Sequence, residues 1–320
     1  MTSVPHQITL PRYAQMNMNK YLRFPSFAIP ISLAISLTSC GPKADSALAA
    51  VQAVEGLTSL PGETEAISTL TIMPIPTETP ASIFRPAPGT IWQWQLDTPV
   101  DISVDAQVFD IDLFDNSESV VSALHAKGAK VICYISFGTF ENWRPDANQF
   151  PPKVIGKKVA GWQGERWLDV RQIELLAPIM LARMDLCKAK GFDGIEPDNI
   201  DGYTNKSGFP LTGDHQLHYN RWLSEQAHLR GLSIGLKNDL DQASELVNDF
   251  DWALIEECFV YDECQASLPF LSAGKQVLDV EYVDQGPAPD ITLLCSQAKT
   301  LGIDLIFKEV DLTAFRQTCY

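Results

Sequence analysis

Gly191-Phe-Asp-Gly-Ile-Glu-Pro-Asp-Asn-Ile-Asp201 is the stretch of the chain that most directly indicates the fold. Gly191 follows a helical pattern with a basic last turn, and glycine suits the left-handed position at which helices end. The apolar run after it has the length of a strand, and the acidic residues occur where that strand ends. Acidic side chains at the carboxyl end of a strand indicate a functional site.

The same junction of a basic helix end, a glycine and an apolar run occurs three more times. Short runs that are apolar on both faces are typical of parallel strands covered by helices. The three junctions are at residues 125–136, 228–238 and 299–308. Further strands, which bring the expected number to eight, are at residues 91–96, 106–112, 252–258 and 276–282. Helices are expected at residues 117–127, 172–190, 213–230 and 290–301, with Asp169 placed to cap the second of them.

Eight strands with intervening helices in about 230 residues predict an α/β fold, a (β/α)8 barrel of the TIM type. It would form a single domain at residues 89–320. An open doubly wound sheet is the alternative. No glycine-rich dinucleotide fingerprint or phosphate loop follows the first strands, which weakens that alternative.

In a barrel of this type the active site lies at the carboxyl ends of the strands. Nearly every expected strand ends in an acidic residue, so the mouth of the barrel should be strongly anionic. The residues predicted to bind substrate there are Trp94, Asp112, Tyr134, Glu196, Asn199, Asp201, Tyr203, Lys237, Asp239, Glu281 and Tyr282.

Asp198 and Glu256 are the candidate catalytic pair. Hydrolysis of a glycosidic bond requires two carboxyl groups, one as general acid and the other as nucleophile or base. Because side chains alternate along a strand, one acid of Glu256-Glu257 can point into the mouth while the other turns away. The alternative is that these acids cap helices or pair with Lys237 and Arg221. Lys237 itself could keep a carboxylate ionised, bind a sugar hydroxyl or form a structural ion pair.

Six segments, taken in order, resemble the glycoside hydrolase family 114 domain, the endo-α-1,4-polygalactosaminidases. The similarity extends from about residue 91 to residue 315, and no single motif carries it. The segments are Trp92-Gln-Trp-Gln95, Phe109-Asp-Ile-Asp-Leu-Phe-Asp115, Val131-Ile-Cys-Tyr-Ile-Ser136, Gly191 to Asp201, Gly235-Leu-Lys-Asn-Asp239 and Glu256-Glu-Cys258.

The resemblance implies a barrel that cleaves α-1,4-linked galactosamine-rich polysaccharide, with the family's two acids at Asp198 and Glu256. By analogy with barrel enzymes similar to α-galactosidases, Asp198 would be the nucleophile and Glu256 the acid/base, with retention of configuration. A carboxyl separation near 5 Å would favour retention, and one beyond about 6.5 Å would favour inversion.

The composition agrees with a cationic substrate. The chain has 24 Lys and Arg against 40 Asp and Glu, a net charge of −16 with 45% hydrophobic residues. Such a field repels nucleic acid and attracts a cationic or partly acetylated amino-sugar polysaccharide, although the charge could also serve solubility alone. Aromatic candidates for stacking on sugars are Trp92, Trp94, Tyr134, Trp143, Trp162, Tyr203 and Tyr282. A monomer is expected.

The first 40 residues are predicted to be a lipoprotein signal peptide. A basic segment from Met18, an apolar run at residues 24–37 and Leu37-Thr-Ser-Cys40 resemble a bacterial signal that ends in a lipidated cysteine, Cys40. Removing its three basic residues takes the net charge from −16 to −19. Residues 41–88 are rich in Pro, Thr and Ala and predict a tether. We expect export and a lipid anchor as the only membrane contact, with the outer membrane or cell surface favoured over the inner membrane.

The six cysteines after Cys40 suggest three disulfides, for which 15 connectivities exist. We expect Cys258 to pair with Cys264, and Cys295 with Cys319. The state of Cys133 and Cys187 stays open, because they could bridge or be buried thiols. No Cys or His spacing resembles zinc ligation, so neither a metal nor a cofactor is expected.

Two other readings of the function remain. A non-catalytic carbohydrate-binding lipoprotein could keep the same barrel, although the presence of both candidate acids argues against it. A hydrolase of another exported glycan is harder to exclude, because a fold and an acid pair do not determine the sugar.

Overall fold

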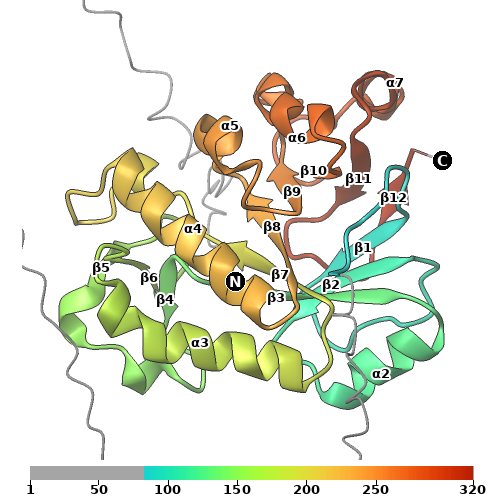
Figure 1. The fold of residues 1–320 in the computed structure, drawn as a ribbon. Coiled ribbons are helices and arrows are strands. Elements are labelled where there is room, and N and C mark those ends of the chain that lie inside the picture. The colour runs from blue at the N-terminus through green and yellow to red at the C-terminus, as the bar shows by residue number, and fades with distance from the viewer. Residues whose placement is uncertain (1–82, 320) are drawn as a thin grey trace, which may run out of the picture. The chain divides into compact units, whose positions relative to one another are not determined.

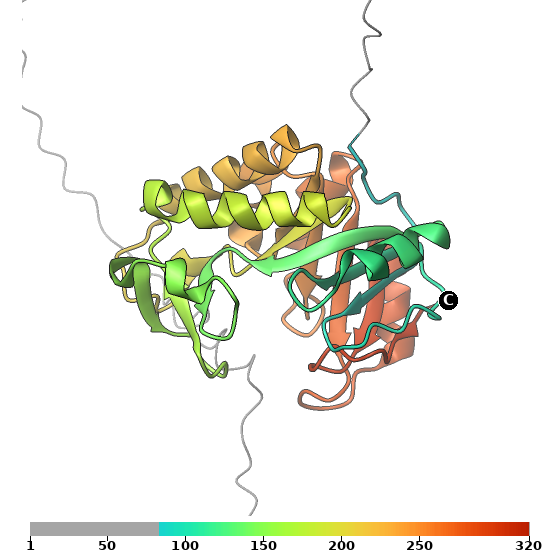
Figure 2. The ribbon, with the colours of Figure 1, turned by 90° about the horizontal axis from the view of Figure 1, so that it is seen from below.

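All eight expected strands are present in the computed structural model, which describes residues 83–319. Each is parallel to the next, and the sheet curls around a central axis with all its carboxyl ends on one side, as the predicted TIM-type barrel requires (Figure 1 and Figure 2). In order of pairing, the strands are β1 (Trp92–Gln95), β2 (Val108–Asp112), β3 (Lys130–Ser136), β7 (Gly194–Asp198), β8 (Ser233–Lys237), β9 (Trp252–Glu256), β10 (Val277–Tyr282) and β11 (Asp304–Lys308).

The sheet ends in a ninth strand, β12 (Gln317–Thr318), which is antiparallel to β11 and was not expected. Among the described residues, β1 and β11 are not paired with each other. The segment before β12 joins them instead: the Leu312 carbonyl accepts hydrogen bonds from the backbone N–H groups of Leu96 and Asp97, at 3.0 and 3.2 Å. Arg316 Nη1 donates to the Trp92 carbonyl at 2.7 Å. The carboxyl-terminal segment therefore closes the barrel.

Helices cover the outside of the sheet, and the four expected ones are confirmed. They are α2 (Glu118–Ala126), α3 (Ile173–Ala189), α4 (Gly213–Leu229) and α7 (Ile291–Leu301). Two short helices, α5 (Ala243–Leu246) and α6 (Leu268–Ser272), were not expected, and no helix lies between β1 and β2. The barrel is therefore an incomplete (β/α)8 pattern. Short 3₁₀ turns lie at Ala147–Gln149, Pro152–Val154, Gly202–Thr204, Leu240–Gln242 and Cys264–Ser267. Asp169 does not cap α3, because its carboxylate is held by the side chain of Arg171.

A small antiparallel sheet interrupts the pattern between β3 and α3. Its strands pair in the order β4 (Thr139–Glu141), β6 (Glu165–Leu168) and β5 (Ile155–Lys158). These strands were not expected, because each has only three or four residues and includes a charged one, so no apolar run marks them. Both views place this sheet beside the carboxyl ends of the central strands (Figure 1 and Figure 2).

Alternation along the strands separates two apolar layers. One packs between the sheet and the helices, and the other fills the barrel interior with residues such as Trp92, Trp94 and Trp252. Gly235 makes room for this filling, because a Cβ atom there would lie 2.5 Å from the Trp252 ring. These side chains fill the barrel interior below the carboxyl ends of the strands.

Three disulfides stabilise the domain. Cys258–Cys264 and Cys295–Cys319 confirm the two expected pairs, and Cys133–Cys187 settles the open one by joining β3 to α3. In the part of the chain that the structure describes, no helix is long and apolar enough to cross a membrane. The signal peptide, Cys40 and residues 41–82 of the tether lie outside the described residues, so the predictions made for them stay predictions.

Candidate active site

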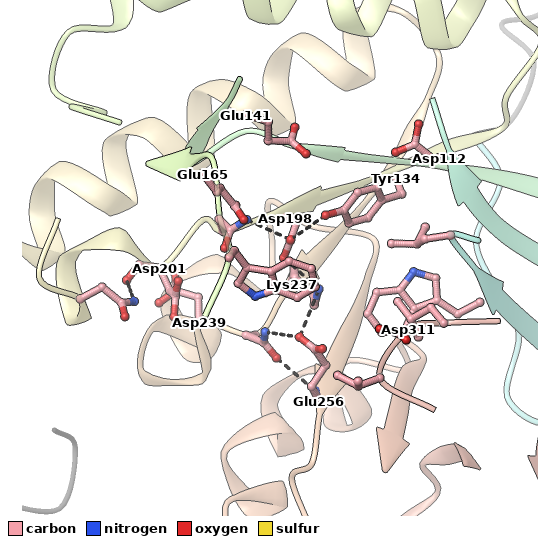
Figure 3. Close-up of a pocket in the computed structure, with 18 of the residues that line it drawn as sticks. Asp112, Tyr134, Glu141, Glu165, Asp198, Asp201, Lys237, Asp239, Glu256 and Asp311 are labelled. Atoms are coloured by element: carbon pink, nitrogen blue, oxygen red, sulfur yellow. Dashed lines mark hydrogen bonds and ion pairs between the residues drawn. The ribbon is translucent and has the colours of Figure 1, made fainter. Parts of the chain in front are cut away.

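A cavity of about 330 Å³ opens at the carboxyl ends of the strands (Figure 3). Its volume lies within the range of small-molecule sites. Both predicted catalytic acids line it, together with eight of the eleven predicted binding residues. The ten residues are Asp198, Glu256, Trp94, Asp112, Tyr134, Asn199, Asp201, Lys237, Asp239 and Tyr282.

Asp198 ends β7 and is held by three donors. The Tyr134 hydroxyl and Asn199 Nδ2 each donate to its Oδ2 atom at 3.0 Å, and Lys237 Nζ lies 2.9 Å from Oδ1. These three contacts fix the orientation of the Asp198 carboxyl group at the cavity. Strand pairing brings Tyr134 on β3 close to Asp198 on β7, since Ser136 at the end of β3 is in register with Asp198.

Glu256 ends β9 and faces Asp198 across the cavity. Its Oε1 atom accepts a hydrogen bond from the Tyr282 hydroxyl, and its Oε2 atom accepts one from Asn238 Nδ2 at 3.0 Å. Asn238 also accepts from the Glu256 backbone N–H at 3.1 Å, which fixes the end of the strand. The neighbouring Glu257 is buried and does not line the cavity, so one acid of the pair faces the mouth and the other turns away, as expected. Glu257 follows the end of β9 with a φ of +58°, so a turn rather than strand alternation sets its direction.

Lys237 joins the two acids. Its ammonium lies 2.8 Å from Glu196, 2.9 Å from Asp198 and 3.3 Å from Glu256, and the residue is only 2% exposed. Burial alone lowers the pKa of Lys237, but the three carboxylates outweigh it and hold the pKa well above its usual value. The ammonium donates to Glu196 and Asp198 and pairs with Glu256, which fits the ion-pair interpretation.

The shared lysine also limits the distance between the acids. The Asp198 and Glu256 oxygens that touch it cannot be further apart than the sum of their 2.9 and 3.3 Å contacts, about 6.2 Å.

Three predicted binding residues do not line the cavity. Glu196 lies beneath Lys237 and is fully buried, and burial is the chief cause that raises its pKa to about 7. Glu281 is also fully buried and accepts a hydrogen bond from the Phe259 backbone N–H at 2.9 Å. The ring of Tyr203 packs beside Gly213 at the start of α4. The Glu196 side chain points into the barrel but lies too far below the carboxyl ends of the strands to reach the cavity. The Glu281 side chain points to the outside of the barrel from β10.

The small antiparallel sheet and the loop after β4 supply cavity residues that the sequence did not identify, chiefly Glu165 and Trp167 on β6 and Arg144 in that loop. Arg144 contacts Asp112 at 2.6 Å and Glu141 at 2.9 Å, so Asp112 lines the cavity with its charge already compensated. Two aromatic candidates, Trp143 and Trp162, also line the cavity and are 50% and 40% exposed. The cluster of acids and tryptophans at residues 141–167 was the only signal for this wall.

No group of His, Cys, Asp and Glu in residues 83–319 is arranged to hold a metal ion. The side chains that line the described cavity carry carboxyl, amide, phenol, ammonium, guanidinium and indole groups. A parallel barrel with two cavity carboxylates that contact one lysine, their contacting oxygens no more than about 6.2 Å apart, defines the class, a glycoside hydrolase.

Comparison with protein families identifies the glycoside hydrolase family to which the chain belongs. The model for glycoside-hydrolase family GH114 matches residues 74–320, so the chain belongs to this family, as the resemblance of its motifs predicted. Comparison with curated proteins gave no match.

Solved structures agree with this assignment. The crystal structure of Aspergillus fumigatus Ega3 in complex with galactosamine is 36% identical in sequence, with a TM-score of 0.71. The match covers 74% of this chain and 98% of Ega3. The glycoside hydrolase domain of PelA from Pseudomonas aeruginosa is 13% identical, with a TM-score of 0.55. This match covers 71% of this chain and 97% of the PelA domain, and it supports the fold alone.

Proposed function

We propose that this protein is an exported, lipid-anchored glycoside hydrolase that cleaves α-1,4-linked galactosamine-rich polysaccharide, such as an exopolysaccharide of a biofilm matrix. The observation that carries the proposal is the pair of cavity carboxylates, Asp198 and Glu256, held on one buried lysine. The substrate rests on the 36% identity to Ega3, whose crystal structure contains galactosamine.

The proposed reaction is retaining. Asp198 attacks the anomeric carbon while Glu256 gives its proton to the leaving oxygen; Glu256 then takes a proton from the water that hydrolyses the glycosyl ester on Asp198. The limit of about 6.2 Å between the two lysine-bound oxygens supports retention, because inverting enzymes need roughly 6.5 to 9.5 Å between their carboxyl groups to admit a water.

The charge of the cavity supports a cationic substrate. Eleven acidic residues line it, against two basic ones, Arg144 and Lys237, which are both paired with carboxylates. An amino sugar without its acetyl group is cationic and would be attracted by this field. The exposed faces of Trp143 and Trp162 offer stacking surfaces for further sugars of a chain.

Export and anchoring rest on the sequence of the first 40 residues. The basic segment, the apolar run and the lipobox-like end at Cys40 support lipidation at the cell envelope. Labelling cells with a radioactive fatty acid tests this part, because Cys40→Ala should abolish the label on the protein. An unchanged label would contradict it.

Hydrolysis is tested by incubating the purified protein with partly deacetylated α-1,4-galactosaminogalactan and measuring reducing ends. We expect Asp198→Asn and Glu256→Gln each to lower the rate at least about a thousandfold, because each removes a group that reacts. Thermal unfolding must show that both variants fold. No release by the wild-type protein, with binding retained, would favour the carbohydrate-binding alternative; release only from another glycan would favour the second alternative.

A further inference from the structure

Glu165 is a third carboxylate beside Asp198 and comes from outside the barrel, on β6 of the small antiparallel sheet. It lines the cavity although only 6% of the residue is exposed. Its Oε1 atom accepts hydrogen bonds from Thr139 Oγ1 at 2.5 Å and from Asn199 Nδ2 at 3.1 Å. Figure 3 shows its carboxyl group next to that of Asp198, on the side away from Glu256.

Asn199 sets the spacing of Asp198 and Glu165. Its Nδ2 atom donates to Asp198 Oδ2 at 3.0 Å and to Glu165 Oε1 at 3.1 Å, so these two oxygens lie at most about 6.1 Å apart. The position of Asn199 is built into the backbone. Its φ is +61°, and Gly138 packs so closely that a Cβ atom there would lie 1.6 Å from the Asn199 carbonyl oxygen.

This spacing matches the geometry of a 2-amino sugar. The amino group is bonded to C2, the neighbour of the anomeric carbon that Asp198 attacks from roughly 3 to 3.5 Å. The nitrogen therefore lies within two bonds of the reacting carbon. A carboxylate oxygen no more than about 6.1 Å from an oxygen of Asp198 can then accept a hydrogen bond of ordinary length from this nitrogen.

We propose that Glu165 binds the 2-amino group of the sugar attacked by Asp198 and thereby selects galactosamine over N-acetylgalactosamine and galactose at that position. This inference rests on the proposed function and identifies the residue that recognises the amino group of the substrate. A free ammonium forms a charge-assisted hydrogen bond with the carboxylate, whereas an acetamide or hydroxyl cannot pair with its charge. Glu141, the neighbouring acid on the same wall, is already paired with Arg144 at 2.9 Å.

The protonation state of Glu165 gives the proposal a distinctive signature. Burial is the chief cause that raises the pKa of Glu165 to about 8. The charges of Asp198 and Glu141 also raise this pKa, whereas the hydrogen bond from Thr139 and the charge of Arg144 lower it. The Tyr134 phenol, whose own pKa is raised well above its usual value by burial, also lies close. Below pH 8 the free protein therefore holds Glu165 as the neutral acid. Binding of an ammonium favours the carboxylate, so the proton leaves to solvent.

Calorimetric titration with galactosamine and with galactose tests the inference on the purified protein. At pH 6.5, in buffers of different ionisation enthalpy, galactosamine should release about one proton from the wild-type protein, and galactose should release none. Glu165→Gln keeps an acceptor for Thr139 and Asn199. The variant should bind galactosamine on the order of tenfold to a hundredfold more weakly than the wild-type protein and should release no proton. Its affinity for galactose should stay within about twofold of the wild-type value.

Two further variants separate recognition from general effects. Glu165→Asp keeps the charge and should retain part of the preference for galactosamine. Glu118→Gln removes one exposed acid of α2, outside the cavity, and should leave binding of both sugars unchanged.

A Glu165→Gln protein that still prefers galactosamine to galactose by the wild-type factor and still releases a proton would overturn the inference. That result, together with normal release of reducing ends by the wild-type protein, would leave the proposed function intact. Absence of reducing ends with the wild-type protein would instead remove the proposed function, and the titrations would still decide whether Glu165 binds the amine.

Discussion

Replacing Lys237 with methionine should destabilise the protein and disable it together. Met has a similar length and no charge, so Glu196, Asp198 and Glu256 would lose the ammonium that lies 2.8, 2.9 and 3.3 Å from them. Removing one partner of a buried ion pair costs about 3 to 5 kcal/mol, because the remaining charge stays buried. Loss of a preorganised charge at a reaction centre lowers kcat about 10²- to 10³-fold.

The loss of stability should depend on pH. In the variant, buried acids have pKa values in the folded protein above those in the unfolded chain, and ionising them weakens the folded state. The pKa of Glu196 is about 7 even beside Lys237. The deficit relative to the wild-type protein should therefore be largest above pH 7 and should shrink toward pH 5.

Urea unfolding between pH 5 and 8 and reducing-end kinetics measure both effects, with the exposed Lys299→Met on α7 as a matched control. The reasoning fails if Lys237→Met unfolds within about 0.5 kcal/mol of the control at pH 8, or if it keeps more than half of the wild-type kcat.

Two further predictions concern the disulfides and the cavity rim. Removing Cys133–Cys187, whose cysteines are 54 residues apart, should lower the unfolding free energy by about 4 kcal/mol, and removing Cys258–Cys264, whose cysteines are 6 residues apart, should lower it by about 2 kcal/mol. Calorimetry of the two double Ser variants checks this order, and equal losses would contradict the dependence on loop length. Trp162→Ala should raise KM for long substrates roughly five- to tenfold with kcat little changed, because a stacking surface contributes about 1 kcal/mol to binding; an unchanged KM would mean that this ring does not contact substrate.

Much of the fold can be predicted from patterns of residues that are adjacent in the sequence. A helix end, a glycine and an apolar run are adjacent in sequence, so the junction that precedes β7 could be recognised four times before any contact was known. The sheet of β4, β5 and β6 could not be recognised, since its strands are short and each is interrupted by a charged residue. Closure of the barrel by residues 309–318 also depends on contacts with β1, more than 200 residues away in the chain.

The candidate site divides in the same way. Asp198 and Glu256 could be named from the sequence because each ends a recognisable strand. A turn with a φ of +58° at Glu257 takes that acid away from the cavity. Glu196 and Glu281 were expected at the mouth but are buried and do not line the cavity, because depth in a barrel and the face of a strand follow from register.

The sequence by itself determined the strands, the acids at their ends and the family to which they belong, because these depend on residues close together in the chain. Only the tertiary structure decided that one lysine from β8 joins the acids of β7 and β9, and that Glu165 from a separate sheet stands beside Asp198. Those distances depend on strand register, barrel closure and the turn at Asn199, which no local pattern of residues encodes.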